Sequence, residues 1–414
     1  MTEFSPLSIS LTKALNKTVK KNHGIFITPR SIIKQLFDII VETAIPIKTI
    51  LEPSCGSGEM VCYADALWSD VEIDGVEFND TIYQGIVSGL SSFRNRVNLI
   101  HADFTKYAPS KKYDLIVGNP PFVVCDKETV PAQYLDLMVG RPNLFCVFIA
   151  HSLSLLKDGG IMAFVVPRSF LNAAYYAKIR NHLMTIGRIV RIADFTAISS
   201  LFIDTDQATI GIVFQKMSVL PAGHICSYSI KLGSNYMFTD NAEHLRQILA
   251  GSTTLANLGM VVKTGTVVWN QHKPLMVSSN VDGVPLLYNS NVASSNTIQL
   301  MEFANDEKKQ YIRMPGQTGK MLVVNRGNGN SAYKLSYALV DSAIIGPYLV
   351  ENHLNMIYPC ANSTLTTEQI DTLFNQIIAS FQHEKTNLFI TTFLGNNGLS
   401  KTELETIFPI WTNL

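Results

Sequence analysis

The sequence has few charged residues and no net charge. Charged residues make up 16% of its 414 residues, and 33 Lys and Arg residues balance 33 Asp and Glu residues. The chain therefore lacks the overall positive field that attracts a polyanion, although a local basic face would suffice for nucleic acid. The hydrophobic content of 47% indicates a protein with a buried core and argues against a disordered chain.

Cysteine pairs and long apolar runs are also missing. The six cysteines form no Cys-x-x-Cys pair, so neither a zinc site nor a disulfide framework is indicated, and we expect reduced thiols. The N-terminus is polar and lacks the apolar core of a signal peptide. No apolar run reaches the roughly 18 residues that a membrane span needs. We expect a cytoplasmic protein that binds no metal and contacts no membrane.

The first half of the chain alternates β-rich runs with helical patterns. Short runs rich in Ile, Val and Leu predict buried strands, and apolar residues at helical spacing predict helices between them. The expected strands are Ile47–Leu51, Val71–Glu77, Val97–His101, Tyr113–Gly118 and Gly160–Val166, and the expected helices include Asp80–Ser92 and Leu144–Leu156. Strands separated by helices indicate a parallel, doubly wound α/β sheet.

Two later apolar runs and a change of amino-acid composition complete the predicted organisation of the chain. Ile189–Phe195 and Ala208–Gln215 leave no room for a crossover helix, so they suit an antiparallel hairpin at the end of the same sheet. From about residue 222, Asn, Ser, Thr and Gly increase and turn dipeptides recur. We predict two domains, 1–220 and 221–414, the second of them an irregular α+β domain.

Polar residues follow three successive predicted strands. The first strand ends in the glycine-bearing turn Glu52-Pro53-Ser54-Cys55-Gly56-Ser57-Gly58, which is no Gly-x-Gly-x-x-Gly dinucleotide fingerprint. Glu77 ends the second strand and Asp103 follows the third. Each acid could simply cap a helix. Acids at neighbouring strand ends also suit a ligand site, where one accepts from ribose hydroxyls and the next from an adenine amino group.

The fourth strand leads into Asn119-Pro120-Pro121-Phe122, which we take as the chemical centre. The prolines fix the turn and remove two backbone donors, so the turn presents the Asn119 side-chain oxygen and the Pro120 carbonyl as acceptors. Two acceptors on a planar amino group favour its pyramidalisation and free the nitrogen lone pair for attack on a methyl sulfonium. Phe122 offers an aromatic face for a base. A rigid turn with a buried Phe is the alternative.

With these motifs the sequence resembles the gamma-class adenine-N6 DNA methyltransferases of the Taq and Eco57I type. Gly24-Ile25-Phe26-Ile27-Thr28-Pro29 is similar to the family's N-terminal motif, and Ser200-Leu201-Phe202 to its late motif, whose Phe packs on the flipped base. Asn119 to Phe122 matches the catalytic motif, with Phe where many members have Tyr. The resemblance implies a Rossmann-like methyltransferase sheet with a C-terminal target-recognition domain.

The resemblance also assigns roles to individual residues. It implies S-adenosylmethionine as cofactor, S-adenosylhomocysteine as product, and a cofactor adenine sandwiched by two phenylalanines, Phe78 and Phe148. The implied cofactor-binding residues are Thr28, Glu52, Pro53, Cys55, Gly56, Glu77, Phe78, Asp103, Phe104, Asn119, Pro121 and Phe148. The implied catalytic residues are Asn119, Pro120, Phe122 and Phe202.

An adenine in duplex DNA must be flipped out to reach such a site. We therefore expect a surface that binds the DNA around the flipped base. Residues 256–340 carry eight cations against four acids, a basic segment that overall neutrality conceals. From it we predict these DNA-binding residues: Lys263, Trp269, Asn270, Lys273, Arg326 and Asn328. Trp269 could instead be a core residue, and the loop around Asn328 a plain hairpin turn.

The sequence thus predicts a site-specific, adenine-specific DNA methyltransferase acting on double-stranded DNA. A separate restriction endonuclease is a compatible partner, and so is an orphan role. Methylation of a base in RNA or of a protein glutamine would use the same turn. A specificity subunit without catalysis is a third interpretation, against which the intact Asn119-Pro120-Pro121-Phe122 argues. Neither the recognition sequence nor the oligomeric state can be read from the sequence.

Overall fold

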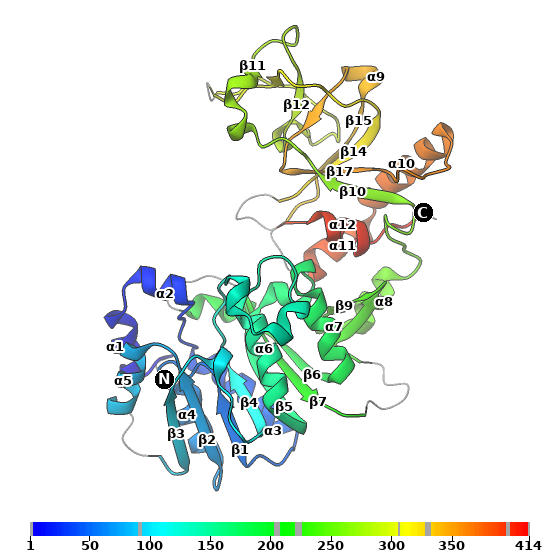
Figure 1. Cartoon of the computed structure of the whole chain (residues 1–414). Coiled ribbons are helices and arrows are strands. Elements are labelled where there is room, and N and C mark those ends of the chain that lie inside the picture. Colours follow the sequence, from blue (N-terminus) through cyan, green and yellow to red (C-terminus); the bar gives the residue numbers. More distant parts are fainter. Residues whose placement is uncertain are drawn as a thin grey trace. The chain divides into compact units, whose positions relative to one another are not determined.

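The chain folds as two units that divide between Glu243 and His244 (Figure 1). The computed structural model describes residues 3–89, 93–202, 208–219, 226–304, 307–327, 333–394 and 398–412. Each unit has its own sheets and its own buried apolar clusters. Among the residues in these ranges, no helix has the length and apolar character that crossing a bilayer requires.

Unit 1 is built on a seven-stranded sheet in the order β3-β2-β1-β4-β5-β7-β6. Its strands are β1 (Thr49–Glu52), β2 (Glu72–Glu77), β3 (Arg96–His101), β4 (Tyr113–Gly118), β5 (Leu156–Pro167), β6 (Gly187–Asp194) and β7 (Thr209–Lys216). The first five pair in parallel, which confirms the predicted α/β sheet. The predicted hairpin is also present, but its second strand, β7, lies between β5 and β6, antiparallel to both.

Alternate residues of the central strands belong to two separate clusters of buried apolar side chains, one on each face of the sheet. In β5, Met162, Phe164 and Val166 enter the cluster that includes helix α6, because successive side chains of a strand point to opposite faces. Ile161, Ala163 and Val165 enter the cluster that includes α3 and α4. Unit 1 is therefore a three-layer α/β/α structure.

The helices of unit 1 connect these strands. They are α1 (Pro6–Ala14), α2 (Lys17–His23), α3 (Arg30–Glu42), α4 (Glu59–Leu67), α5 (Asp80–Gly89), α6 (Leu144–Leu155) and α7 (Ala177–Ile186). The predicted α5 and α6 are present with nearly the predicted bounds; residues 90–92 lie outside the described ranges. Helix α6 buries almost every side chain, which explains why its apolar pattern is nearly continuous.

The division between the units comes later than the boundary predicted at residue 220. The strand pair β8 (Ser229–Leu232) and β9 (Asn235–Phe238) packs against α7, so it lies in unit 1. Arg180 of α7 holds this pair, because its Nε donates to the Tyr236 carbonyl at 2.7 Å. Polar, turn-rich composition does not reveal that a strand pair returns to the preceding domain.

Unit 2 has short strands and a helical C-terminal part. One antiparallel sheet runs β10-β17-β14-β15 and a second sheet runs β11-β13-β12-β16. The strands are β10 (Met260–Thr264), β11 (Met276–Val277), β12 (Val284–Leu287), β13 (Tyr311–Ile312), β14 (Lys320–Asn325), β15 (Tyr337–Asp341), β16 (Leu349–Val350) and β17 (Leu354–Pro359). The helices are α8 (Ala242–Leu249), at the division, α9 (Ser342–Ile345), α10 (Thr367–Gln382), α11 (Glu384–Phe393) and α12 (Lys401–Thr406).

Candidate functional site

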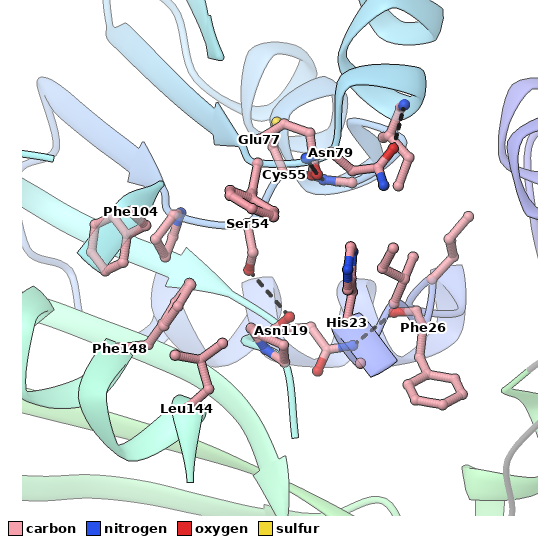
Figure 2. A pocket seen from close by; sticks show the side chains of 18 of the residues that line it. His23, Phe26, Ser54, Cys55, Glu77, Asn79, Phe104, Asn119, Leu144 and Phe148 are labelled. Carbon is pink, nitrogen blue, oxygen red and sulfur yellow. Dashed lines mark hydrogen bonds between the residues drawn. The ribbon is translucent and has the colours of Figure 1, made fainter. Parts of the chain in front are cut away.

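Two adjacent central strands deliver the two main motifs to one edge of the sheet. After β1 the chain moves outward to β2 and β3, and it returns to form β4 on the other side of β1. Ligands of open α/β sheets bind at this kind of switch point, beyond the carboxyl ends of the strands. Gly118 allows the two motifs to meet closely, since a Cβ there would lie 3.2 Å from Pro53 Cδ. The Ser54 hydroxyl also donates to the Asn119 carbonyl at 3.2 Å (Figure 2).

Glu77 joins the glycine-bearing turn to the loop after β2. Its carboxylate accepts hydrogen bonds from the Gly56 backbone N–H at 2.9 Å and the Asn79 backbone N–H at 2.7 Å. Gly56 has a φ of 51°, a left-handed conformation that favours glycine. Burial raises the pKa of Glu77, although these backbone hydrogen bonds oppose the shift. Glu77 thus has a structural part in shaping the turn, and its carboxylate also lines a cavity.

This cavity, of about 320 Å³, brings the predicted cofactor residues together. Its lining includes all twelve: Thr28, Glu52, Pro53, Cys55, Gly56, Glu77, Phe78, Asp103, Phe104, Asn119, Pro121 and Phe148. Figure 2 shows Phe104 and Phe148 gathered in one part of the view, with Glu77 and Asn79 in another. The sequence motifs, spread over much of unit 1, therefore line one volume.

The aromatic walls of the cavity differ in exposure. Phe148 and Phe104 are buried and pack together with ring centroids 4.8 Å apart. Phe78 is 61% exposed, and its ring meets that of His23 edge-on at 6.0 Å. Asp103 caps the short turn after β3, because its Oδ1 accepts from the Thr105 backbone N–H at 3.0 Å. The helix-capping interpretation of Asp103 is thus correct, and the residue also lines the cavity.

Glu52 is a buried acid with an unused oxygen. The residue is 4% exposed, and within the described part of the chain its Oε2 has no hydrogen-bond partner. Burial raises the pKa of Glu52 well above its ordinary value, and the nearby carboxylate of Glu77 adds to the shift. A buried carboxylate of this kind is stabilised in its ionised form when a positive charge or a donor enters the cavity.

The Asn119 side chain is held in one orientation. Its Nδ2 donates both hydrogens, one to the Phe26 carbonyl at 3.1 Å and one to Thr28 Oγ1 at 3.0 Å. Because the amide nitrogen is fully used, the network fixes which end is Oδ1. Among the described residues no donor bonds to Oδ1 or to the Pro120 carbonyl. The turn therefore keeps two acceptors available.

A second, small cavity adjoins this turn and contains the predicted catalytic residues. It is lined by Gly24, Phe26, Asn119, Pro120, Phe122, Phe202 and Thr209. Gly24 has a φ of 62°, and a Cβ there would lie 3.0 Å from Pro121 Cβ, so the N-terminal motif touches the catalytic turn directly. Phe122 and Phe202 thus face the same volume as the two acceptors, although they are 80 positions apart in the chain.

Comparison with known proteins identifies this region. Residues 27–202 match the family described as Eco57I restriction-modification methylase. This stretch, which spans less than half of the chain, is similar to the methylases of this family. The two cavities lie in the matched region, except for the lining residues that precede Ile27 and for Thr209.

Similarity to two viral methylases extends over nearly the whole chain. Modification methylase CviBIII of Paramecium bursaria Chlorella virus NC1A is 25% identical over 417 residues, which is 98% of each chain. Type II methyltransferase M.CvrRI of Paramecium bursaria Chlorella virus XZ-6E is 23% identical over 415 residues, again 98% of each chain. A DrdV–DNA complex solved by cryo-electron microscopy has a TM-score of 0.53 at 14% identity. The match covers 92% of this chain and 54% of that chain, and it shows a shared fold.

Several residues that line the two cavities were missed in the sequence. Asn79 lines the large cavity, and its position just before α5 marks it as a helix cap, which its hydrogen bond to the Ile82 N–H confirms. His23 lines the same cavity from α2, and Phe26 and Thr209 line the small one. Phe26 belongs to the N-terminal motif, which is recognised without a role for this residue. Nothing local in the sequence marks His23 or Thr209, because only tertiary packing brings them to the site.

Three of the predicted DNA-binding residues are exposed on unit 2. Lys263 lies on β10 with its Nζ 5.6 Å from the Tyr358 ring centroid. Lys273 is exposed but forms a 2.5 Å ion pair with Glu307. Asn270, three positions before Lys273, is also exposed. Their contacts with DNA stay predictions.

The other predicted DNA-binding residues of unit 2 have different surroundings. Trp269 is partly buried and packs beside a small core that includes Val267, which agrees with the alternative of a core residue. Arg326 is half-buried, and its Nη1 donates to the Asn352 carbonyl at 2.8 Å, so part of its guanidinium is engaged within unit 2. Asn328 lies outside the described residues.

Proposed function

We propose that this protein is a type II DNA methyltransferase that transfers a methyl group from S-adenosylmethionine to N6 of a flipped-out adenine in duplex DNA. The observation that carries the proposal is the Asn119 amide, whose two hydrogens are used by Phe26 and Thr28 while Oδ1 stays available beside the Pro120 carbonyl. Two fixed acceptors fit an amino group with two hydrogens. The names of the viral relatives, a modification methylase and a type II methyltransferase, support the same class.

The large cavity fits the proposed cofactor on chemical grounds. S-adenosylmethionine is a cation with an aromatic base, a ribose and an electrophilic methyl group, and when bound it supplies that methyl group. The buried, unpartnered Oε2 of Glu52 suits a positively charged or hydrogen-donating ligand. The carboxylates of Glu77 and Asp103 suit hydroxyl and amino groups, and Phe78 and Phe148 supply aromatic walls for a base.

The residues of this chain would act by orientation. Asn119 Oδ1 and the Pro120 carbonyl accept the two amino hydrogens of the base and hold the nitrogen with its lone pair free. Phe122 and Phe202, which line the small cavity, hold the ring by stacking. No side chain of the turn is a strong base, and none is needed, because the amine becomes acidic once it is methylated. Catalysis would rest mainly on positioning two bound groups.

Unit 2 is proposed as the target-recognition domain. Its lysines at positions 263 and 273 are exposed and can meet phosphates, although Lys273 must leave or share its partner Glu307. A base must leave the duplex to reach the small cavity, and extrusion needs protein contacts with the flanking DNA. A separate restriction endonuclease would be the partner if the protein acts in a restriction-modification system.

Methyl transfer to three classes of substrate tests the proposed function. Labelled S-adenosylmethionine is supplied with duplex DNA, structured RNA or protein, and the labelled DNA is digested to nucleosides and analysed by mass spectrometry. We expect N6-methyladenine in DNA alone. Label in RNA or protein without label in DNA would refute the proposal, and N4-methylcytosine would refute its choice of base. Long-read sequencing of DNA from cells expressing the protein would give the recognition site.

Replacing Phe202 by alanine is expected to weaken the hold on the flipped base. The side chain is 6% exposed and lines the small cavity beside Asn119, so its loss removes one stacking face, worth about 1–3 kcal/mol per base. With 2-aminopurine at the target position, we expect the fluorescence rise on binding to fall by at least half. Phe393→Ala in unit 2 is the control. An unchanged signal in Phe202→Ala would contradict the assigned stacking role.

A further inference from the structure

The two N-terminal helices form one wall of the large cavity. From α1 and the residue after it, Leu11, Thr12 and Leu15 line the cavity, and from α2 Asn22 and His23 do so. We call α1 and α2 the N-terminal wall. His23 of this wall meets Phe78 edge-on, so the wall reaches the exposed aromatic residue that faces the proposed cofactor. The wall precedes the matched methylase region, which begins at residue 27.

One carboxylate fastens the N-terminal wall to the cofactor turn. Glu59, the first residue of α4, accepts the Ser5 backbone N–H at 2.9 Å and the Ser8 hydroxyl at 2.5 Å on its Oε1. Its Oε2 accepts Arg30 Nε at 3.3 Å. The Ser8 hydroxyl is also hydrogen-bonded to that of Ser57, within the turn itself, at 2.8 Å. A single side chain thus joins α1, α3 and α4.

A second attachment holds the other side of α1. Leu11 and Leu7 lie over two glycines of α5, Gly85 and Gly89, which are one helical turn apart. A Cβ on Gly85 would lie 2.4 Å from Leu11 Cδ2, and one on Gly89 would lie 2.9 Å from Leu7 Cδ1. The absence of side chains on this face of α5 lets α1 approach closely, and Figure 1 shows α1 beside α5. Helix α5 begins directly after the Phe78 loop.

We propose that Glu59 is a positioning residue that latches the N-terminal wall over the cofactor cavity, so that release of cofactor or product requires this latch to open. The inference rests on the proposed function, because it takes the large cavity as the cofactor site. It adds that the residence time of the bound ligand is set by contacts of the wall with Glu59 and α5, which lie outside the methyl-transfer chemistry.

The charge state of Glu59 is consistent with a latch. Burial opposes its ionisation, but the hydrogen bonds from Ser8 and Ser5, together with the charge of Arg30, outweigh burial and hold the pKa of Glu59 below its usual value. The carboxylate therefore stays ionised at neutral pH and accepts its donors as a charged group, which gives stronger hydrogen bonds than a neutral acceptor.

Release of S-adenosylhomocysteine from the full-length protein tests the latch. The dissociation rate is measured by stopped-flow displacement for wild type, Glu59→Ala, Glu59→Gln and the control Asp38→Ala. Asp38 also pairs with a cation, Lys34, but on an exposed face of α3. We expect release to become about tenfold faster in Glu59→Ala, a change of about 1.4 kcal/mol, and to be partly restored in Glu59→Gln, whose Oε1 still accepts from Ser5 and Ser8. The control stays at the wild-type rate.

Gly85→Ala gives an independent test that leaves the carboxylate intact. The Cβ of alanine displaces Leu11 and the N-terminal wall, while the higher helix propensity of alanine offsets part of the cost in stability. We expect faster release of S-adenosylhomocysteine from Gly85→Ala too. If Glu59→Ala does not fold, the release rate of Gly85→Ala tests the latch by itself. Wild-type release rates in Glu59→Ala and Gly85→Ala would overturn the latch alone. Failure of the wild-type protein to bind S-adenosylhomocysteine would overturn the proposed function and the latch together.

Discussion

Replacing Asn119 by alanine is expected to lower kcat for methyl transfer by at least about 100-fold while S-adenosylhomocysteine affinity changes little. Removing one preorganised hydrogen-bonding group that acts on the reacting atoms typically has an effect of this size. The side chain supplies one of the two proposed acceptors for the amino group, and its other contacts are with Phe26 and Thr28. Single-turnover methylation and calorimetric titration with S-adenosylhomocysteine measure the two quantities separately.

A matched variant separates the acceptor from its orientation. Asn119→Asp keeps an oxygen for the amino group but loses the two hydrogens that bond to the Phe26 carbonyl and Thr28. The new carboxylate is repelled by the Phe26 carbonyl, so we expect activity between those of wild type and Asn119→Ala. Full activity of Asn119→Ala would rule out the role assigned to this side chain. Equal loss of cofactor binding and of turnover would show that its role lies in the fold of the turn.

Replacing Arg180 by methionine is expected to lower the free energy of unfolding of unit 1 by about 3 kcal/mol or more, because each buried acceptor left without a donor costs about 1–3 kcal/mol. Arg180 is fully buried. Its guanidinium donates to the carbonyls of Tyr236, Phe170, Ala173 and Asn172 at 2.7 to 3.4 Å. Methionine fills similar volume but leaves these buried carbonyls without their donor, which is costly. Calorimetry of the full chain measures the shift of the unit 1 transition.

An exposed arginine of the same unit gives the control for this stability effect. Arg191 forms a 3.1 Å ion pair with Glu42, and both side chains are about half exposed or more, at 47% and 63%. Exposed pairs contribute little because water screens them, so Arg191→Met should change the unfolding free energy by about 0–1 kcal/mol. Equal shifts of the unit 1 transition in Arg180→Met and Arg191→Met would contradict this prediction. The four carbonyl contacts of Arg180 would then not be what attaches β8, β9 and the turn after β5 to α7.

Much of the fold of unit 1 follows from local patterns. The strands of the parallel sheet are short, apolar on both faces and flanked by helices, so their order in the chain predicts an α/β sheet whose carboxyl edge gathers Glu52, Glu77 and Asn119. The position of β7 between β5 and β6 is not predicted, because a hairpin can add to a sheet edge by either strand. The helical wall formed by α1 and α2 is not predicted. Leu7, Leu11 and Leu15 recur at helical spacing in and just after α1, but this local pattern does not reveal which surface the helix covers.

The finer parts of the site depend on distant packing. Which atom of Asn119 faces the substrate is set by Phe26 and Thr28, and no rule of spacing links them to the catalytic turn. The same holds for Glu59, whose partners Ser5 and Arg30 lie on other elements. In unit 2 the basic segment is evident in the sequence, and so is the alternative of a core position for Trp269, but only the packing decides between that alternative and DNA contact.

The hydrogen bonds of Asn119 also bear on the order in which activity is acquired during folding. Its Nδ2 reaches across 91 positions of sequence to Thr28 and 93 to Phe26. Contacts between such distant positions carry a large loop-closure cost, and helices and neighbouring strands form without them. The sheet of unit 1 can form before the N-terminal segment packs against it. In such a chain the Asn119 side-chain amide is free to rotate, because its contacts with Phe26 and Thr28 are missing. Catalytic competence is therefore expected to arise after the sheet does, and to be lost first when the segment around Phe26 detaches.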